Sequence, residues 1–244
     1  MIIGLICIAS GVLSGVAGFG ALIIMVPALL LMMPVDIIVP LGVLCGIATQ
    51  TYNVATFRRH IRTDALGKLL LGSLPGIWVG SSLLLHLPEV ALRCSMGGLL
   101  ICYVLWSTFG KLPPPTRQPA AVWAYTAGFF SGAFGAAFGI NGPPAIVYAT
   151  RTPWSPPEIR AFFGVFCLIL FIFTAVTMYF RGLIVPEVLR LTLLAIPACL
   201  AGSFCGMRIA ARIQTAQYMR LVFTLLFIMG LSLCWPAVRQ LLQA

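Results

Sequence analysis

The chain has very little charge. Only 8% of its 244 residues are charged, whereas 61% are hydrophobic. A soluble domain of this length needs more charged groups than this to cover its surface. The composition therefore excludes a soluble domain. Apolar runs of about 20 residues, enough to cross ~30 Å of hydrocarbon, recur along the whole chain. We therefore predict an all-α integral membrane protein with several crossings and no separate soluble domain.

Acidic residues are rarer still, and none falls inside a predicted span. The five that exist lie at the ends of apolar segments or in loops: Asp36, Asp64, Glu89, Glu158 and Glu187. Proton-coupled carriers usually place such a group within the membrane. Lys, Arg and His are also missing from the span centres, so a bound anion would be held by dipoles and amides. A negative cell interior drives anion export at ~2.3 kcal/mol per charge per 100 mV, with no proton needed.

Clusters of metal-binding or redox residues are also missing from the sequence. The eight cysteines stand singly, which favours apolar packing over metal ligation or disulfides: Cys7, Cys45, Cys94, Cys102, Cys167, Cys199, Cys205 and Cys234. A membrane enzyme or redox subunit would need an intramembrane constellation of His, Glu or paired Cys. We therefore predict no enzymatic activity, no cofactor and no metal site.

The net charge of +10 has two interpretations. A basic chain can bind nucleic acid, but in a chain this apolar the positive residues more often occupy cytoplasmic loops. We therefore predict no nucleic-acid partner. The start of the chain has no basic n-region and no clear cleavage site after the first apolar run, so we interpret it as mature structure.

A short phrase occurs twice in the chain. Five of its residues recur 117 positions later, namely Ser14, Gly15, Gly18, Pro27 and Ala28. Both copies lie in long apolar stretches, where glycine and proline interrupt helices. Duplicated, interrupted membrane segments are typical of transporters that bind substrate at the repeat interface. We predict two membrane repeats, residues 1–110 and 121–244, joined by a Pro-rich cytoplasmic linker at 111–120.

Two of the expected apolar segments are too long for a single crossing. The segments are 2–33, 36–57, 65–87, 90–109, 121–149, 158–180, 187–207 and 216–238. A single helix over the first would be ~48 Å long, well beyond the thickness of a bilayer. The first and the fifth segments carry the glycine-rich phrase near the middle. Each is either one unwound crossing or two half-helices that form a re-entrant hairpin.

The positive residues favour the hairpins, because such residues collect on the cytoplasmic side of membrane proteins. Eight simple crossings divide the 15 Lys and Arg residues 9 to 6 between the two sides, whereas two non-crossing hairpins divide them 11 to 4. Each repeat then has three transmembrane helices, so the two repeats are inverted. This topology places the linker in the cytoplasm and both termini in the periplasm of a bacterial inner membrane.

The tips of the two hairpins are the first candidate for a substrate site. Each tip precedes an apolar helix, whose first N–H groups are unpaired and carry a partial positive charge. Two such ends that face one point can bind an anion without a charged side chain. The alternative is close helix packing through small residues. The tip residues are Gly18, Phe19, Gly20 and Ala21 in the first repeat, and Gly139, Asn141 and Gly142 in the second.

Two amides deep in the second segment, Gln50 and Asn53, are the other candidates for substrate binding. Burying an amide in hydrocarbon is costly unless it finds a partner. The two side chains therefore either line the substrate cavity or make a hydrogen bond between helices, which is common in membrane bundles.

The chain resembles the sulfite exporter TauE/SafE family in four motifs. These are the glycines Gly15, Gly18 and Gly20, the run Asn141-Gly142-Pro143-Pro144, the spaced residues Pro156, Glu158 and Arg160, and the run Gly182-Leu183-Ile184. They extend over essentially the whole chain in the family's order. Two positions at the proposed site differ from the family pattern: Asn141, where glycine is usual, and Ala21, where a second glycine is common. The resemblance implies transport of a sulfur-containing anion such as sulfite, thiosulfate or an organosulfonate.

The sequence thus predicts an exporter of a small sulfur-containing anion, with alternating access around a midplane site at the two tips. An importer of such an anion is the alternative, and a non-transporting membrane scaffold is a more remote one. The partners would be the anion and the lipid bilayer. No oligomer is required, because one chain supplies both tips.

Overall fold

The protein is helical throughout the part that the structure describes. The computed structural model describes residues 2–17, 21–57, 65–109, 119–149, 151–154, 156–210, 224 and 226–235. In chain order its helices are α1 (Ile2–Ala17), α2 (Ala21–Leu30), α3 (Val35–Phe57), α4 (Leu66–His86), α5 (Glu89–Phe109), α6 (Ala121–Phe138), α7 (Gly142–Ala149), α8 (Pro156–Phe180) and α9 (Pro186–Ala210), followed by a short apolar helix, Leu226–Trp235.

Five of the described helices are long and apolar enough to cross a membrane, namely α3, α4, α5, α8 and α9. This confirms the prediction of an all-helical, multi-pass membrane protein. The large apolar side chains that these helices expose belong on a surface that meets lipid, among them Trp78, Phe180 and Leu194. Residues 111–118 of the predicted linker 111–120, and most of the basic loops, at 58–64 and 211–223, lie outside the described residues.

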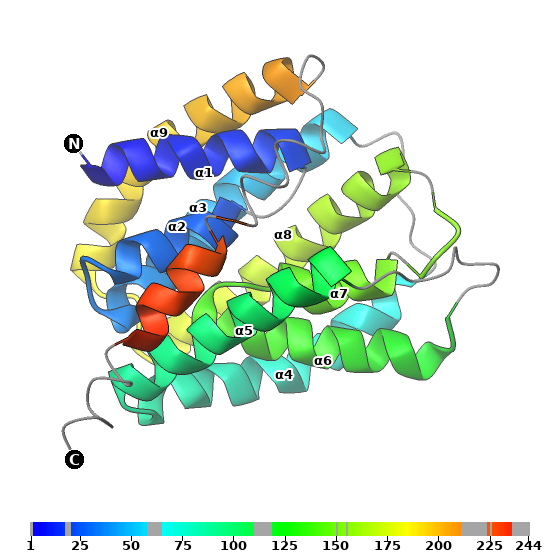
Figure 1. Cartoon of the computed structure of the whole chain (residues 1–244), viewed down its shortest axis with the longest axis horizontal. Coiled ribbons are helices and arrows are strands. Elements are labelled where there is room, and N and C mark those ends of the chain that lie inside the picture. Colours follow the sequence, from blue (N-terminus) through cyan, green and yellow to red (C-terminus); the bar gives the residue numbers. More distant parts are fainter. Residues whose placement is uncertain are drawn as a thin grey trace.

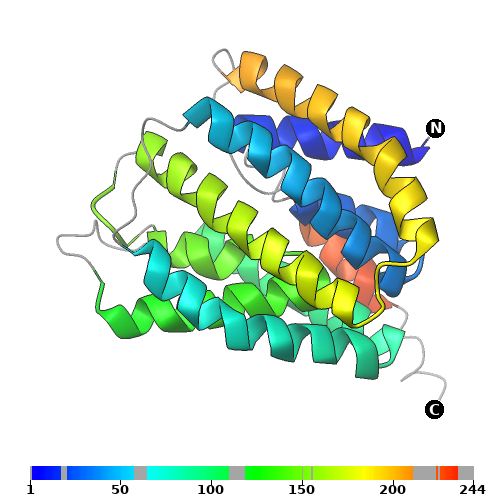
Figure 2. The ribbon, with the colours of Figure 1, turned by 180° about the vertical axis from the view of Figure 1, so that it is seen from behind.

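Each of the two over-long apolar segments contains two helices. The first segment divides into α1 and α2, and the fifth divides into α6 and α7. At 1.5 Å per residue, α2 is about 15 Å long and α7 about 12 Å, roughly half of what a bilayer needs. Each short helix packs against the helix before it, and α2 returns along α1 in both ribbon views (Figures 1 and 2).

The break in the second repeat is fixed by a glycine. Gly139 caps α6 in the left-handed conformation, with a φ of 72°. Its N–H donates to the carbonyl of Gly135 at 3.0 Å, and the N–H of Ile140 donates to the carbonyl of Phe134 at 3.3 Å. These two hydrogen bonds satisfy carbonyl groups in the last turn of the helix. An unpaired carbonyl in low-dielectric surroundings would cost several kcal/mol.

The second helix of each pair begins at a different place in the repeated phrase. Ala21, where α2 begins, corresponds to Phe138 at the repeat offset of 117, yet Phe138 is the last residue of α6 and α7 begins at Gly142. Relative to the phrase, α7 therefore begins four residues later than α2. As a result Pro27 lies inside α2, whereas its counterpart Pro144 lies in the first turn of α7.

The two largest contacts between helices join one half of the chain to the other: α1 with α9, and α4 with α6. In both, glycines let the backbones meet directly. A Cβ on Gly11 would strike the carbonyl of Cys199, and one on Gly15 would lie 2.7 Å from the backbone nitrogen of Met207. The residue later in α1 contacts the residue later in α9, so the two helices run parallel.

The contact between α4 and α6 repeats this arrangement. A Cβ on Gly72 would strike the carbonyl of Tyr125, and one on Gly80 would strike that of Ala133, so these helices also run parallel. Glycines on α6 contribute as well, because a Cβ on Gly132 would strike the carbonyl of Ser73. Small residues that allow such close approach are the usual means of helix association in membranes.

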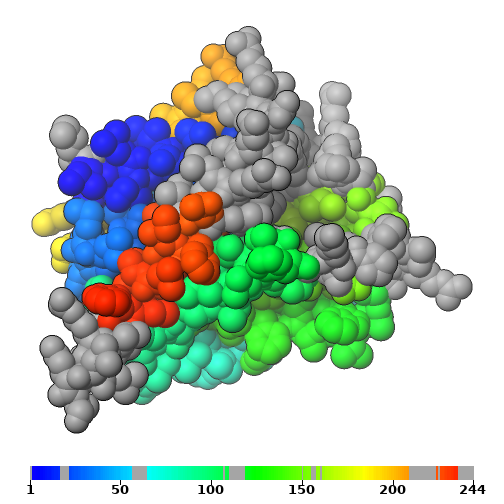
Figure 3. All heavy atoms as spheres, viewed as in Figure 1, coloured from blue at the N-terminus to red at the C-terminus, as the bar shows by residue number. Residues whose placement is uncertain are grey.

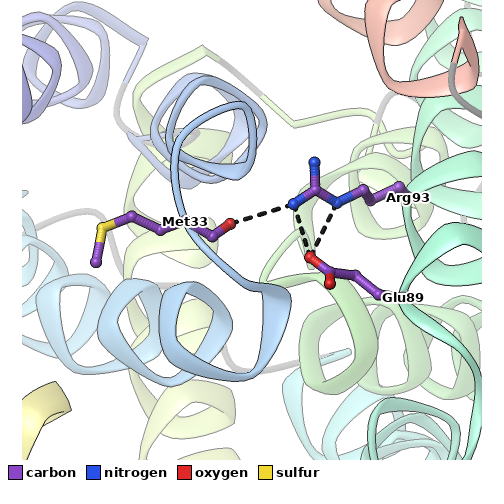
Figure 4. Close-up of polar contacts among 3 residues, drawn as sticks. All are labelled: Met33, Glu89 and Arg93. Carbon is purple, nitrogen blue, oxygen red and sulfur yellow. Dashed lines mark hydrogen bonds and ion pairs between the residues drawn. The ribbon is translucent and has the colours of Figure 1, made fainter.

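The first hairpin is also held by a contact at its outer end. Arg93 at the start of α5 pairs with Glu89 at 2.6 Å and donates to the carbonyl of Met33, in the turn after α2, at 3.4 Å (Figure 4).

The Leu226–Trp235 helix packs on α5, where a Cβ on Gly97 would lie 2.6 Å from the carbonyl of Gly230. Figure 3 shows this last helix, in red, between α5 and the first helices of the chain.

We expect Gly76→Ala to destabilise the protein, because its new Cβ would strike the carbonyl of Phe129 on α6. Overpacking of this kind costs about 1–3 kcal/mol. Gly98→Ala on α5 is the matched control, because nothing lies within 4 Å of its Cβ position. Thermal melting in detergent should show a clear loss for Gly76→Ala only, and equal melting temperatures would contradict the close approach of α4 to α6.

Candidate functional site

A small buried cavity lies where α1, α2 and the α6–α7 connection meet α3 and α8. Its volume is about 20 Å³, and its lining comes from α1, α2, α3, the α6–α7 connection and α8: Ser14, Leu22, Ile23, Gly46, Thr49, Gln50, Gly139, Ile140, Asn141, Gly142, Cys167 and Phe171. None of these side chains is charged. The cavity therefore sits between the two halves of the chain, at the level of the interrupted helices.

The structure brings several of the sequence-predicted site residues to this cavity. Gln50, Gly139, Asn141 and Gly142 line it, from α3 and from the second break. Asn53 lies directly behind the lining and contacts two of its members. Ala21 begins α2, whose next two residues line the cavity. The remaining predicted residues, Gly18, Phe19 and Gly20, lie outside the described residues.

Asn53 connects the first hairpin to α3. Its Nδ2 donates to Oγ of Ser14 on α1 at 3.1 Å and to Oε1 of Gln50, one turn earlier on α3, at 2.6 Å. All three side chains are buried, with exposed fractions of 1% for Ser14 and Asn53 and 3% for Gln50. The sequence left an interhelical hydrogen bond and a place in a cavity lining as alternatives for the two amides. Asn53 makes the interhelical hydrogen bond, to Ser14, and Gln50 lines the cavity.

Asn141 is the cavity residue with an unused donor. Its side chain is only 6% exposed, and its Oδ1 accepts from the thiol of Cys167 at 3.8 Å. Its Nδ2 has no hydrogen-bond partner among the described residues. A buried donor without a partner costs about 1–3 kcal/mol. The amide is therefore available to an acceptor that enters the cavity.

The two helices that follow the breaks offer different donors. The first turn of α2, from Ala21 to Ile24, keeps all of its N–H groups. The first turn of α7 contains Pro143 and Pro144, which have no N–H. The side chain of Asn141 therefore stands where the second helix end has lost backbone donors.

The cavity is smaller than any sulfur oxyanion. A space of about 20 Å³ holds roughly one water molecule. Phe171 limits the space, because its ring packs on Gly46, where a Cβ would lie 2.7 Å from ring atom Cε2. A larger ligand therefore requires the helices around the cavity to separate.

Several lining residues were not among the sequence-predicted site. Ser14 carried a signal, because it belongs to the repeated phrase, and Thr49 adjoins Gln50. The Thr49 hydroxyl donates to the carbonyls of Cys45 at 3.1 Å and Gly46 at 3.2 Å, as buried threonines in membrane helices commonly do. Cys167 and Phe171 lie on an apolar helix face, and no local pattern distinguishes them from core residues.

The described residues contain no group of three or more His, Cys, Asp or Glu side chains placed to hold a metal ion. Three buried thiols, Cys7, Cys45 and Cys199, lie near one another on α1, α3 and α9. They are outside the cavity lining and contribute small apolar packing groups there.

Comparison with known proteins identifies the family. The chain belongs to the sulfite exporter TauE/SafE family, whose model matches residues 3–233. A similar curated protein, from Cupriavidus necator, is described as a "Probable sulfite/organosulfonate exporter TauE". It is 26% identical over 229 residues, which cover 91% of this chain and 87% of the relative. No solved structure matches the chain. Family membership and the apolar helices confirm a transmembrane transporter of this class.

Two glycines with the same left-handed φ of 72° allow the break to be tested. Alanine in this conformation costs about 1–2 kcal/mol at either position. At Gly139 the new Cβ would also lie 3.1 Å from Cγ2 of Val26, whereas nothing lies within 4 Å at Gly182. We expect both Gly139→Ala and Gly182→Ala to lower the melting temperature, with the larger decrease for Gly139→Ala. A decrease confined to Gly182→Ala would contradict the geometry of the break.

Proposed function

We propose that the protein exports a small sulfur-containing anion, sulfite or an organosulfonate, by alternating access around this cavity. The observation that carries the proposal is the amide of Asn141, an unpartnered donor in a buried cavity lined by no charged side chain. An anion supplies the acceptor that this donor lacks. Family membership and the name of the Cupriavidus necator relative support the substrate class and the direction.

The neighbouring amides prepare the cavity for an anion. Because Asn53 donates to Oε1 of Gln50, the acceptor end of Gln50 is engaged and its NH₂ end is the one that can donate into the cavity, where Cys167 is its present neighbour. Asn53 also donates to the oxygen of Ser14, so the Ser14 hydroxyl hydrogen is left for another acceptor. Together with Asn141 these groups surround the cavity with donors. Preorganised neutral donors are effective toward an anion where water is excluded.

Alternating access follows from the way the two halves hold each other. We propose that each hairpin is re-entrant and that the two repeats are inverted. The matching contacts of α1 with α9 and of α6 with α4, made by glycines at corresponding positions, support this symmetry. The 11 to 4 division of basic residues supports it independently. Rocking of one half against the other would open the small cavity to each side in turn.

Removal of the amide donor tests the site. We expect Asn141→Ala to weaken anion binding by about ten- to a hundredfold, because a hydrogen bond to a charged ligand contributes about 1.5–3 kcal/mol. The measurements are thermal stabilisation of the purified protein by sulfite and isethionate, and flux of each anion in proteoliposomes.

Ser203→Ala is the matched control for this test. It also removes a buried polar atom without a hydrogen-bond partner among the described residues, but on α9 and away from the cavity lining. We expect wild-type flux from this variant. Unchanged flux in Asn141→Ala would place the site elsewhere, and no anion response from the wild-type protein would indicate a scaffold.

The inverted topology can be tested at two described positions, Gly67 near the start of α4 and Val185 before α9. A membrane-impermeant maleimide should label Gly67→Cys from the cytoplasmic side and Val185→Cys from the periplasmic side. Eight simple crossings would instead put both positions on the same side. The unsubstituted chain gives the background from its native thiols, and labelling of both variants from one side would overturn the hairpin topology.

A further inference from the structure

We infer that the cavity accepts singly charged anions and rejects doubly charged ones, so that sulfite is carried as hydrogensulfite. This inference rests on the proposed function and specifies the ionic form of its substrate. It follows from the kind of donors that the cavity contains, from the acceptors beside them and from the cost of moving charge out of water.

The donors of the cavity are all uncharged. The lining offers the amide of Asn141, the hydroxyl of Ser14 and the NH₂ end of Gln50, and no lysine or arginine. The sequence adds no charge at the first tip, because residues 18–20 are Gly, Phe and Gly. The lining residue that can ionise is Cys167, and its thiol contacts Oδ1 of Asn141 at 3.8 Å.

The backbone compensates for about one negative charge. A helix N-terminus is equivalent to roughly half a positive elementary charge, so two such ends supply about one. The prolines at the start of α7 reduce its share, because they remove two of the N–H groups that carry this charge. A second negative charge on the ligand would therefore have no counterpart in the cavity.

The cost of desolvation grows faster than the gain from binding. The interaction of an ion with fixed dipoles rises in proportion to its charge, whereas its desolvation penalty rises with the square of the charge. A doubly charged ion thus gains about twice as much from the cavity but loses about four times as much on leaving water. In a site without a cation this difference selects the monoanion.

Acceptors at the cavity favour a protonated ligand as well. Among the described residues, Oδ1 of Asn141 receives only the long contact from Cys167, at 3.8 Å. Hydrogensulfite carries one hydrogen that can be donated, and isethionate carries a hydroxyl group. Fully ionised sulfite and thiosulfate have no hydrogen to donate, so they would leave this oxygen without a strong partner.

The test is anion flux in proteoliposomes with equal pH inside and outside and the membrane potential clamped at zero. The second ionisation of sulfurous acid lies close to neutral pH, so the fraction of hydrogensulfite can be varied without extreme conditions. Above that ionisation, we expect sulfite flux at fixed total concentration to fall about tenfold per pH unit. Isethionate is a monoanion throughout this range, so its flux should stay constant. Thiosulfate, a dianion throughout, should give at least tenfold less flux than isethionate.

Two controls separate this inference from the proposed function. Protein-free liposomes measure the sulfur dioxide that crosses the bilayer unaided, and Asn141→Ala shows which flux passes through the cavity. If no anion gives protein-dependent flux at any pH, the proposed function fails. If thiosulfate moves as fast as isethionate, or sulfite flux rises with its dianion fraction, the function stands and the inference is overturned.

Discussion

The close approach of α1 to α9 and of α6 to α4 is the contact on which the rest of the structure depends. Each hairpin is anchored on a helix from the other half, backbone against backbone, because glycines remove the side chains between them. A short helix such as α2 or α7 cannot hold its depth in a membrane alone. With these anchors in place, α1, α2 and the α6–α7 connection line a cavity together with α3 and α8.

The cavity combines two properties that oppose each other in most proteins. It is buried among apolar helices, which makes any charge costly, and it carries polar groups that are not all satisfied. The cost of the unmatched Asn141 amide is tolerated because the surrounding packing is extensive, with Phe162, Phe163 and Phe166 of α8 fully buried. An unsatisfied group of this kind is what the proposed anion site would leave in the absence of its ligand.

A neutral site also suits the energetics of transport. Binding must be strong enough to capture the anion and weak enough to release it on the other side. A lysine or arginine in the cavity would hold an oxyanion tightly and slow its release. In the proposed mechanism amides and helix ends would hold it less tightly, and the membrane potential would supply ~2.3 kcal/mol per charge per 100 mV toward export.

Much of this architecture could be predicted from the sequence, since hydrophobic runs, glycine and proline act locally and basic loops follow a simple rule of sidedness. The helical segments, the two interrupted ones and the polar residues Gln50, Asn53 and Asn141 were all identifiable in this way. The tertiary structure alone decided which helices pair across the two halves. It also showed that Ser14 meets Asn53, that Cys167 and Phe171 complete the lining, and that α7 begins later than α2 relative to the repeated phrase. These features depend on contacts between residues far apart in the chain, and no local pattern of residue types encodes such contacts.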